Sequence, residues 1–553
     1  MRVALVAHGG PGIGVGHVVR AVALAQEARS RGHNVTLAGW VDGPFLTELL
    51  AHADLPVVPL SADAQSAEML AALGGGAGAG VGGGAGAGGG AETGGGAGAG
   101  ALPDVIHVDT YRLHDDLLAA LAERSERVLL SAMEDSEFGR RPAHVVVDST
   151  IGADEVARPG VPARWLALGA RYTPLRTDIS RLRGRRDGGA AAREGVARDA
   201  VAPGDAAEDA DGRLRVLVVM GGADPTGLTP RVLDVLGRTG VPLAVTAVVQ
   251  PAAQAAVAEV AATHPGLALT VTPPTGSLPE LYTTHDVVVS ASGTSVWELC
   301  CVQVPMALVC AVDNQVEGYR RVVDAGAALG LGGPAFDQAE QDTAVSELRE
   351  WLSPNAFDVR EAAARRAGEL VDELGAYRVV HTWEVAATAG RPRTSEGLTV
   401  RGATLDDART LFDWRNDPQT RALSRSSDEL VYDDHVAWLR GSLERDDRVL
   451  LIVTGPDGGQ VGTVRWDHEG HDDWEVSITV APSARGQGLA TPMLLAAEEH
   501  LAQTADVRSY LAVVHTDNEP SRRLFATADY VADLPPDAAG FERYRKRSTR
   551  RPS

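Results

Sequence analysis

The sequence has few cysteines and few aromatic residues, and these shortages argue against several classes of protein. Its three cysteines, Cys300, Cys301 and Cys310, are an odd number without paired spacing, which argues against a disulfide framework and against a zinc cluster. Aromatic residues make up 5% of the chain, too few to predict a stacking platform for single-stranded nucleic acid. We therefore expect neither a bound metal nor a nucleic-acid partner.

Positive charge is also scarce. The chain holds 51 Lys and Arg residues against 74 Asp and Glu residues, a formal net charge of −23, and its only lysine is Lys546. A surface with this balance repels nucleic acid and acidic membranes. No stretch approaches the ~18 apolar residues of a membrane span, and the apolar run at the N-terminus is too short for a signal peptide. The sequence therefore predicts a soluble, cytoplasmic protein without a membrane partner.

Glycine, with 62 residues, is abundant and partly clustered. Residues 74–100 are almost only Gly and Ala, which predicts a disordered insertion in a surface loop. Residues 184–213 are rich in Ala, Gly and charge and predict a linker, and a second linker is expected at 389–396. A length of 553 residues suggests three or four domains at ~150 residues each. Between the breaks we predict three folded blocks, 1–183, 214–388 and 397–548.

The first two blocks alternate apolar strands with helices. Continuous apolar runs, such as residues 3–7 and 214–220, are typical of buried parallel strands in a doubly wound sheet. The third block begins with polar helices and continues with strands, the last of which runs into a Gly-rich turn and a helix. The predicted fold class is α/β, a pair of Rossmann-type domains followed by an α+β domain.

A Gly-rich turn joins the first strand to the first helix. Gly14 and Gly16 allow backbone amides to approach a ligand, and the start of a helix carries a partial positive charge. His17 stands at this helix start, where the positive end should keep the imidazole neutral and able to accept a proton. A capping or surface histidine is the alternative.

The second block has a similar strand-to-helix junction. Ser292, Gly293 and Thr294 offer amide and hydroxyl donors to a diphosphate. Glu298, one turn into the helix, has the chemistry to accept hydrogen bonds from two ribose hydroxyls, and a buried salt bridge is the alternative. The sequence Asp-Asn-Gln ending at Gln315 follows the next strand, at the edge where open α/β sheets bind ligands.

These two blocks resemble the UDP-sugar hydrolase of pseudaminic acid biosynthesis, a GT-B-like relative of the glycosyltransferases that make bacterial lipid II. The motifs that carry the resemblance occur in the order of the family and include Gly14, Gly16, His17, Arg20, Asp109, Tyr111, Gly169, Tyr172, Arg176, Gly221, Gly222, Asp224, Pro225, Ser292, Gly293, Thr294, Trp297, Glu298, Asn314 and Gln315.

The resemblance implies a cleft that holds UDP, mainly through the second block. It implies that His17 is the base that activates a water molecule, which attacks the anomeric carbon and expels UDP without a metal. The substrate and UDP contacts that it implies are Gly14, Gly16, Arg20, Tyr111, Tyr172, Gly222, Asp224, Ser292, Gly293, Thr294, Glu298, Asn314 and Gln315.

The first loop departs from the family pattern. The family usually has Arg-x-Asp before the Gly-rich turn, whereas this chain has Val6 and His8 at those positions. The change removes a carboxylate that would orient the sugar or the histidine. The Gly/Ala insertion at 74–100 is also foreign to the family.

The third block contains an Arg-x-x-Gly-x-Ala turn that leads into a helix. Amides at such a helix start suit a pyrophosphate, and the downstream Asn518 and Ser521, which follow a strand and begin another helix, strengthen the signal. The block resembles a GNAT N-acetyltransferase along its whole length, so acetyl-CoA is implied as a co-substrate. The implied contacts are Val480, Arg485, Gly486, Gln487, Gly488, Leu489, Ala490, Asn518 and Ser521.

The start of this block looks like the branch that holds ribosomal-protein acetyltransferases and the pseudaminic-pathway enzyme, which acts on the 4-amino group of a UDP-sugar. Glu475 and His515 are the candidates for the general base. Some family members use a tyrosine acid where Phe525 stands, and Tyr530 is the candidate substitute. The implied acceptor contacts are Trp414, Arg415, Asn416 and His435, with packing in the core as the alternative for the tryptophan.

The two resemblances together predict a bifunctional enzyme of pseudaminic (nonulosonic) acid biosynthesis. It would acetylate a UDP-4-amino-sugar and then hydrolyse UDP from the UDP-diacetamido-trideoxyhexose. Three alternatives stay open: a GT-B glycosyltransferase fused to an acetyltransferase, a non-catalytic UDP-sugar-binding module that presents substrate to the GNAT domain, and acetylation of protein N-termini by the third block. The oligomeric state is left open.

Overall fold

The computed structural model describes residues 1–74, 101–112, 116–123, 127–156, 158, 163–183, 213–221, 224, 226–422 and 428–548. The predicted insertion at 74–100 and the predicted linker at 184–213 therefore lie outside the described residues, except for Gly74 and Arg213. The chain forms two compact units. The first is Met1–Pro162 with Leu168–Tyr377, and the second is Ala163–Ala167 with Arg378–Ser553.

The first unit holds two parallel sheets, which confirms the predicted α/β class. In the N-terminal sheet the strands follow the order β3-β2-β1-β4-β5-β6, and β1 lies in the buried centre. Strand β7 (Trp165–Leu168) lies where the chain divides between the two units. The other elements are β1 (Arg2–Ala7), α1 (Gly16–Ser30), β2 (Asn34–Gly39), α2 (Pro44–His52), β3 (Val57–Pro59), α3 (Ser66–Gly74), β4 (Val105–Asp109), α4 (Leu117–Ala122), β5 (Leu129–Glu134) and β6 (Val145–Asp148).

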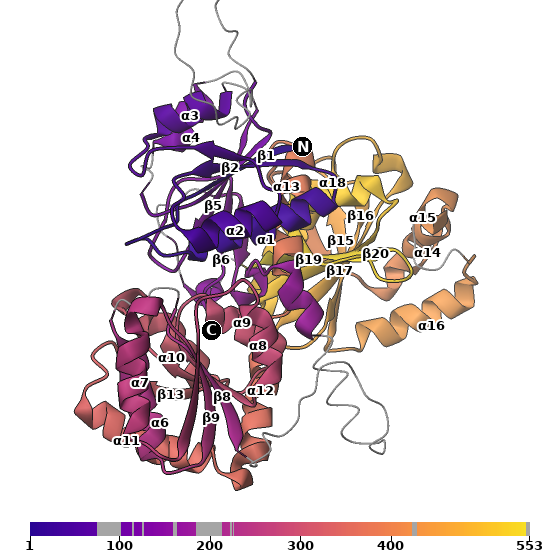
Figure 1. The fold of residues 1–553 in the computed structure, drawn as a ribbon. Helices are drawn as coiled ribbons and strands as arrows, with labels where there is room; N and C mark the ends of the chain where they lie inside the picture. Colours follow the sequence, from indigo (N-terminus) through magenta and orange to yellow (C-terminus); the bar gives the residue numbers. More distant parts are fainter. Residues whose placement is uncertain are drawn as a thin grey trace, which may run out of the picture. The chain divides into compact units, whose positions relative to one another are not determined.

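The second sheet of this unit has six parallel strands in the order β10-β9-β8-β11-β12-β13. In Figure 1, β8 and β9 lie between α6 and α7 on one side and α8 and α12 on the other. The elements are β8 (Leu214–Val219), α6 (Leu228–Arg238), β9 (Leu243–Val248), α7 (Gln254–Ala262), β10 (Leu267–Thr272), α8 (Leu278–Thr284), β11 (Val287–Ala291), α9 (Ser295–Val302), β12 (Met306–Val309), α10 (Val316–Asp324), β13 (Leu329–Gly332), α11 (Gln338–Trp351) and α12 (Phe357–Leu370).

Helices cover both faces of this second sheet because successive side chains of a strand point to opposite faces. In β8, Val216 and Val218 pack into a core with α6, α7 and α11. The alternate residues Leu217 and Val219 pack into a second core with residues of α8, α9 and α12. The continuous apolar run of the strand thus reflects burial on two sides.

The second unit is a seven-stranded mixed sheet with helices, ordered β14-β15-β16-β17-β18-β20-β19. Among these neighbours β17 and β18 run parallel, and the pairs on either side are antiparallel. The elements are β14 (Thr399–Gly402), α14 (Ala408–Asn416), α15 (Pro418–Ala422), α16 (Tyr432–Leu443), β15 (Arg448–Thr454), β16 (Gln460–His468), β17 (Asp473–Val480), α17 (Ala490–Thr504), β18 (Ser509–His515), α18 (Glu519–Thr527), β19 (Val531–Leu534) and β20 (Phe541–Arg547).

Helix α13 (Gly375–Thr388) belongs mostly to the second unit, which begins at Arg378, upstream of the predicted 389–396 linker. The reason is packing: Val385 joins the core of the mixed sheet, and the Arg378 guanidinium donates to the carbonyl of Asp533 at 2.6 Å. Sequence periodicity identifies a helix but does not say which neighbour buries its apolar face.

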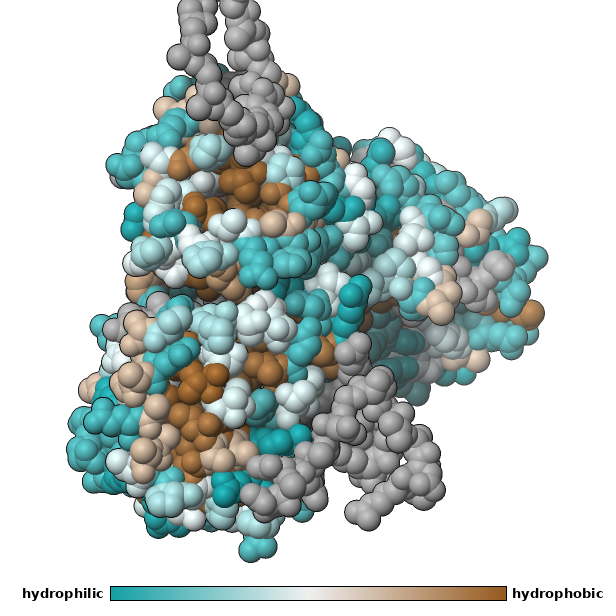
Figure 2. Space-filling model, viewed as in Figure 1, coloured by the Kyte–Doolittle hydropathy of each residue, from teal (hydrophilic) through white to brown (hydrophobic). Residues whose placement is uncertain are grey.

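Three features of the described residues concern membrane spans, the surface and the cysteines. None of the described helices is both long and apolar enough to cross a bilayer. The face in Figure 2 carries hydrophilic residues around smaller hydrophobic areas. All three cysteines are free buried thiols, and burial raises the pKa of Cys301 to about 12, which makes it a poor nucleophile.

Candidate functional sites

The first site lies at the C-terminal edge of the N-terminal sheet. Ala7 of β1 is in register with Asp109 of β4, so the loop that follows β1 begins beside this carboxylate. That loop leads into α1, which places His17 in its first turn. Because parallel strands end at a common edge, residues far apart in sequence meet here.

His17 and Asp109 form a buried pair. Nδ1 of His17 lies 2.7 Å from Oδ1 of Asp109, and the two residues are 6% and 2% exposed. A carboxylate only accepts, so Nδ1 carries the proton and Nε2 of the neutral ring is a free acceptor. Asp109 therefore fixes both the tautomer and the direction of the ring, as a general base requires.

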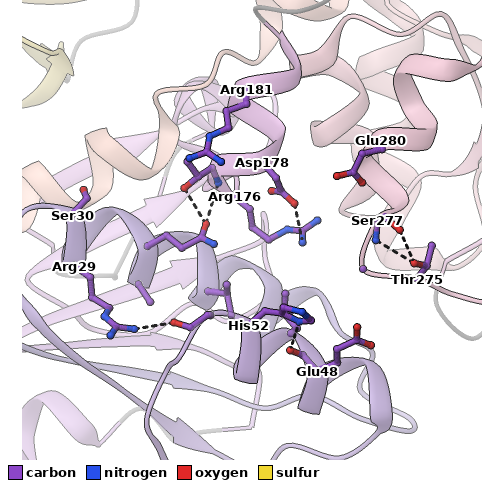
Figure 3. A pocket seen from close by; sticks show the side chains of 17 residues that line it. Arg29, Ser30, Glu48, His52, Arg176, Asp178, Arg181, Thr275, Ser277 and Glu280 are labelled. Carbon is purple, nitrogen blue, oxygen red and sulfur yellow. Dashed lines mark hydrogen bonds and ion pairs between the residues drawn. The ribbon is translucent and has the colours of Figure 1, made fainter. Parts of the chain in front are cut away.

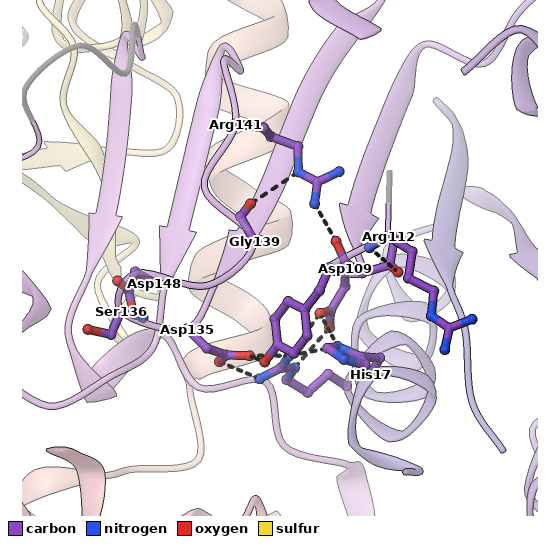
Figure 4. A network of polar contacts seen from close by, with 11 residues as sticks. His17, Asp109, Arg112, Asp135, Ser136, Gly139, Arg141 and Asp148 are labelled. Carbon is purple, nitrogen blue, oxygen red and sulfur yellow. Dashed lines mark hydrogen bonds and ion pairs between the residues drawn. The ribbon is translucent and has the colours of Figure 1, made fainter. Parts of the chain in front are cut away.

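Arg20 holds Asp109 in its ionised form. Its guanidinium donates to both oxygens of Asp109 at 2.8 Å and to both oxygens of Asp135 at 2.7 and 2.9 Å. Its Nη2 also lies 3.1 Å from Nδ1 of His17, but two donors cannot bond to each other. Burial alone would raise the pKa of Asp109, yet Arg20 and His17 outweigh it and hold that pKa well below its usual range. In Figure 4 the side chains of His17, Asp109 and Asp135 converge.

Tyr111 contacts this cluster and is partly exposed to solvent. Its ring meets the ring of His17 edge-on with centroids 4.7 Å apart, and its hydroxyl donates to Asp135 at 2.5 Å. Burial and the neighbouring Asp135 raise the pKa of the phenol, so it remains a donor. The sequence expectation did not assign Asp109 or Asp135 a role, although both follow buried strand segments at the ligand-binding edge.

Val6 and His8, which stand where the family usually has Arg-x-Asp, both have structural roles in this chain. Val6 is wholly buried in β1. His8 is also buried, and its Nδ1 accepts a hydrogen bond from the amide of Trp40 at 2.9 Å, which ties the ends of β1 and β2 together. Burial lowers the pKa of His8 and favours the neutral ring. The carboxylates near His17 come from Asp109 and Asp135 instead.

The junction between β11 and α9 lies close to the start of α1. A Cβ atom on Gly16 would stand 3.0 Å from Cγ2 of Thr294, so the two helix starts approach each other. Gly14, with φ of 89°, adopts a backbone conformation that suits glycine. Two helix N-termini that converge provide free amides and partial positive charge for an anion.

Gln315 ties this junction to the loop after β12. Its side-chain oxygen accepts from the hydroxyl of Ser292 at 3.2 Å and from the amide of Ala311 at 3.0 Å. Gly293 lies against it, because a Cβ atom there would be 3.4 Å from Nε2 of Gln315. Asn314 lies beside it in a short 3-10 turn, Asp313–Gln315. The predicted residues Ser292, Gly293 and Gln315 are therefore brought together.

Glu298 sits in a buried polar network. It accepts from the hydroxyl of Tyr282 at 2.9 Å and lies 3.6 Å from the guanidinium of Arg176. Burial raises the pKa of Glu298, and Arg176 and Tyr282 oppose that shift. The salt-bridge alternative is thus part of the structure. Tyr172 is 2% exposed and lies in the interior, and its role as a substrate contact stays a prediction.

Asp224 has a structural role that the sequence did not reveal. Its two oxygens accept from the amides of Leu228 and Thr229 at 2.8 and 2.9 Å, and one also accepts from the Thr229 hydroxyl at 2.7 Å. The carboxylate therefore satisfies the first two amides of α6, and its assignment as a UDP contact stays a prediction. Gly222 lies outside the described residues.

A cavity of about 770 Å³, lined by both polar and apolar residues, adjoins Glu298 through Arg176. Arg29, Glu48 and His52 line one side, from α1 and α2 (Figure 3). Thr275, Ser277 and Glu280 line the other, from the start of α8 and the loop before it. Neither His17 nor Thr294 lines the cavity, so it is a neighbour of the base rather than its immediate surroundings.

The second unit has an opening between its two parallel strands. β17 and β18 pair from Asp473 to Val476, opposite Ser509 to Ala512, and then part although both strands continue. Beyond Val476 the strand register pairs β17 with β16 alone, and strand β17 ends at the half-buried Val480. A linear ligand can bond to exposed backbone groups as an added strand does.

The turn after β17 leads into α17. Gly486 and Gly488 have φ angles of 76° and 72°, which glycine adopts without strain, and Leu489 precedes the first helical residue, Ala490. The Gln487 side chain donates to the carbonyl of Ser483 at 3.0 Å, within the turn. The backbone is thus shaped to present amides at a helix start.

The side chain of Arg485 is bonded to other residues of the chain. Its guanidinium lies 2.7 Å from a carboxylate oxygen of Asp417 and donates to the side chains of Gln419 and Thr420 at 3.0 and 2.7 Å. It therefore anchors α15 to the turn, and its role as an acetyl-CoA contact stays a prediction. Asn518 likewise caps α18, where its side-chain oxygen accepts from the amide of Ser521 at 3.2 Å.

Glu475 and His515 differ as candidate bases. Glu475 is half-buried on β17, one residue before the last pair with β18. Nδ1 of His515 accepts from the amide of Asp517 at 3.2 Å, so in the neutral ring Nε2 carries the proton and is a donor. This tautomer favours Glu475 as the proton acceptor.

Tyr530, the candidate acid, lies in the interior of the GNAT unit. It is fully buried, and its hydroxyl donates to the buried Glu498 at 2.9 Å, while Glu498 also pairs with Lys546 at 2.6 Å. Burial raises the pKa of Tyr530 further above that of a free phenol. A group enclosed in this way does not reach a thiolate at the strand opening.

The predicted acceptor residues divide between packing and polar roles. Trp414 packs against the cores on both faces of the sheet, which is the alternative foreseen for it. Asn416 forms two hydrogen bonds with the backbone of Leu430, at 2.8 and 3.0 Å, and so fixes the approach to α16. His435 is buried and stacks on Trp438 with centroids 5.4 Å apart. Burial lowers the pKa of the Arg415 guanidinium, near Arg421 and Arg465.

Comparisons with known proteins identify the second unit. Residues 397–531 match the family model described as Acetyltransferase (GNAT) domain, so the chain carries such a domain there and that prediction is confirmed. A search of curated proteins finds no match. Among the described residues no group of three or more His, Cys, Asp or Glu is placed to hold a metal ion.

Three solved structures are similar to parts of the chain. Spermidine N-acetyltransferase from Vibrio cholerae, in complex with CoA and spermine, is 16% identical over 27% of this chain and 93% of its own, with a TM-score of 0.25. A domain from Methanocaldococcus jannaschii is 18% identical over 27% and 98%, with a TM-score of 0.25. MurG from Acinetobacter baumannii is 17% identical over 68% and 98%, with a TM-score of 0.44.

Proposed function

We propose that the protein performs two consecutive reactions on one UDP-sugar of nonulosonic acid biosynthesis. The GNAT unit transfers acetyl from acetyl-CoA to the amine of a UDP-4-amino-sugar. The two-sheet unit then hydrolyses the UDP-diacetamido-trideoxyhexose to UDP and the free sugar. The observation that carries the hydrolase part is the buried 2.7 Å bond between His17 and Asp109, which leaves Nε2 of the imidazole as an acceptor.

In the hydrolytic step Nε2 of His17 removes a proton from water. The water oxygen forms a bond to the anomeric carbon, the bond from that carbon to the UDP oxygen breaks, and its electrons leave with UDP. The positive charge that develops on the imidazole is stabilised by the ionised Asp109, which Arg20 holds in place. The proton then passes from His17 to solvent, and the base is restored.

The converging starts of α1 and α9 support the assignment of the leaving group. Their free amides suit the diphosphate, and each helix start carries about half a positive charge. The cavity beside Arg176 and Glu298 is large and polar enough for the nucleoside part. Local donors of this kind offset the unfavourable net charge of −23 for an anionic ligand.

In the acetyl transfer the acceptor amine loses a proton to Glu475, directly or through water. The amine nitrogen attacks the thioester carbonyl, the carbon–sulfur bond breaks, and CoA leaves as a thiolate that takes a proton from solvent. The opening between β17 and β18 suits the pantetheine arm, and the turn at Gly486 and Gly488 suits the pyrophosphate of CoA.

Product analysis tests both reactions. The purified chain is mixed with a synthetic UDP-4-amino-4,6-dideoxy sugar that carries a 2-acetamido group, with and without acetyl-CoA, and products are followed by mass spectrometry. We expect CoA and the N-acetylated UDP-sugar first, and then UDP with the free diacetamido sugar. Without acetyl-CoA we expect little UDP.

The same experiment separates the alternatives. A glycosyltransferase releases UDP only when an acceptor is added, and the sugar is then found on that acceptor. A binding module yields the acetylated UDP-sugar and no UDP. A protein acetyltransferase leaves the amino sugar unchanged and acetylates a peptide N-terminus.

A further inference from the structure

Two aromatic rings beside His17 are left open to solvent. Tyr111 is 44% exposed and Phe138 is 48% exposed, with ring centroids 5.9 Å apart and planes tilted by 50°. Tyr111 in turn contacts the ring of His17 at 4.7 Å. Exposed apolar surface this close to a candidate base is typical of a place that a ligand covers.

The ring of Phe138 is carried by a rigid turn. The turn follows β5, and Asp135 and Phe138 exchange two backbone hydrogen bonds of 3.0 and 3.1 Å across it. Ser136 within the turn has φ of 62°, an uncommon value for a residue other than glycine. Uncommon backbone conformations of this type concentrate where the structure positions a ligand contact.

The ring of Tyr111 is part of the same piece of structure. A Cβ atom on Gly139 would lie 3.4 Å from the ring of Tyr111 and 3.1 Å from the carbonyl oxygen of Met133, so the glycine allows the ring to pack against the turn. The guanidinium of Arg141 donates to the carbonyls of Gly139 and Thr110, which joins the turn to the end of β4. The two rings are therefore preorganised.

This pair is linked to the catalytic dyad through Arg20. The hydroxyl of Tyr111 donates to Asp135, Asp135 is bonded by both Nη atoms of Arg20, and the same guanidinium binds Asp109. A group that packs against the exposed surface of the two rings is thus held at a fixed place relative to Nε2 of His17. We name Tyr111 and Phe138 the aromatic notch.

We propose that the aromatic notch receives the methyl-bearing edge of the substrate's sugar ring, and that Phe138 determines specificity for a 6-deoxy sugar. The inference rests on the proposed nucleotide-sugar site and extends it to a residue that the hydrolytic step does not use. The two rings contact each other, with centroids 5.9 Å apart and planes tilted by 50°, and a methyl group can pack against the apolar surface that they leave exposed.

The apolar surface of the aromatic notch determines the expected preference for a methyl group over a hydroxymethyl group. Phe138 has no hydrogen-bonding group, so a 6-hydroxyl placed against it loses water without gaining a partner. A methyl group in the same place gains from burial. One buried methyl group corresponds to about a four-fold tighter complex, and the unpaired hydroxyl adds to the difference, so a preference of about 4- to 20-fold is expected.

Binding measurements on the full-length His17→Ala variant test the notch without turnover. Calorimetry compares UDP, the UDP-2,4-diacetamido-2,4,6-trideoxyhexose and its 6-hydroxy analogue of the same ring configuration. We expect the deoxy sugar to bind about 4- to 20-fold more tightly than the 6-hydroxy analogue. Adding Phe138→Ala should bring the two within about two-fold and leave the dissociation constant for UDP unchanged.

The matched control is Phe357→Ala, which removes an equally exposed ring, 50% accessible, at the start of α12. It should change none of the three affinities. Phe138→Leu, which keeps an apolar side chain, should retain part of the preference. Saturation transfer in NMR from aromatic protons to the sugar's C6 methyl group should be strong in the parent and weak in Phe138→Ala.

The outcomes separate this inference from the proposed function. If Phe138→Ala weakens all three ligands equally, or none of them, the notch does not select the sugar edge. If the sugar nucleotides bind no more tightly than UDP to the parent, the notch receives no sugar, whatever the hydrolysis assay gives. If the notch selects the deoxy sugar but wild-type protein releases no UDP from it, the inference stands and the hydrolase assignment falls.

Discussion

The two candidate catalytic regions are built in opposite ways. The site around His17 consists of side chains bonded to one another, with the buried Asp109 and the half-buried Asp135 sharing one guanidinium. The site in the GNAT unit consists mainly of backbone, namely two strands that part after Val476 and a turn with two glycines in positive φ. The first should therefore be sensitive to single side-chain atoms, and the second to changes of backbone conformation.

The largest effect is expected for His17→Ala. Loss of the general base should lower UDP release by about 10²–10⁴-fold. Acetyl transfer, which occurs in the other unit, should continue at the wild-type rate in the same sample and so provides the control for folding. Release of UDP at an unchanged rate would remove His17 from the mechanism.

Asp109→Asn should reduce hydrolysis nearly as much, although the side chain keeps its size. The amide no longer requires the proton on Nδ1, so Nε2 is not kept free, and the imidazolium loses its counter-charge; about 10²–10⁴-fold in kcat is expected. The Michaelis constant for the UDP-sugar should change little. A rise in the Michaelis constant at constant kcat would instead make Asp109 a binding residue.

Gly488→Val probes the backbone site. At φ of 72° a β-branched residue is strained by about 1–3 kcal/mol, and the turn should reorient its amides, which should weaken acetyl-CoA binding more than about ten-fold. Gly458→Val is the matched control, since Gly458 has φ of 82° in the hairpin between β15 and β16. It should lower stability similarly and leave CoA affinity intact, as measured by calorimetry and thermal melting.

Tyr530→Phe should leave acetyl transfer within about two-fold of wild type, while Glu475→Gln should reduce it by about 10²-fold. The phenylalanine removes a donor from the buried Glu498, so the unfolding free energy should fall by about 1–3 kcal/mol. A large loss of kcat in Tyr530→Phe, without loss of CoA binding, would restore this residue as the acid.

The smallest effect is expected for the pH dependence of stability that Asp109 causes. The pKa of Asp109 is lower in the folded state than in the unfolded chain, so its stabilisation is complete above the unfolded value of about 3.9 and is lost as pH falls through the folded value. In the His17→Ala background, which removes the neighbouring imidazole, the stability difference between Asp109 and Asp109→Asn should therefore stay constant from pH 8 to pH 5. Urea unfolding at each pH measures this stability difference. A steady decline of the difference from pH 8 to pH 5 would contradict the lowered pKa of Asp109.

Sequence patterns predicted the architecture well because buried parallel strands are continuous apolar runs and Gly-rich turns mark the ends of strands. They also placed His17 at a helix start, since that position depends on local sequence. The partner Asp109 lies 92 residues away, and only the strand register of β1 with β4 brings the two together. Such contacts require the sheet order, which the sequence alone does not provide.

Four residues of the predicted sites have structural contacts of their own. Asp224 and Asn518 accept hydrogen bonds from amides at helix starts, and short acceptors and exposed amides are typical both of helix starts and of phosphate-binding loops. Arg485 and Tyr530 are satisfied by carboxylates from distant segments. The residue types at these positions suit a structural role and a ligand-binding role equally well. The contacts in the structure are what distinguish the two roles.

The central claim is that water activated by His17 attacks the anomeric carbon. Wild-type protein should be given the UDP-diacetamido-trideoxyhexose in water enriched in ¹⁸O, with rapid quenching and mass spectrometry of both products. The claim predicts one ¹⁸O atom in the free sugar and none in UDP, and loss of both products in His17→Ala. Label found in UDP, or UDP released without free sugar, would contradict it.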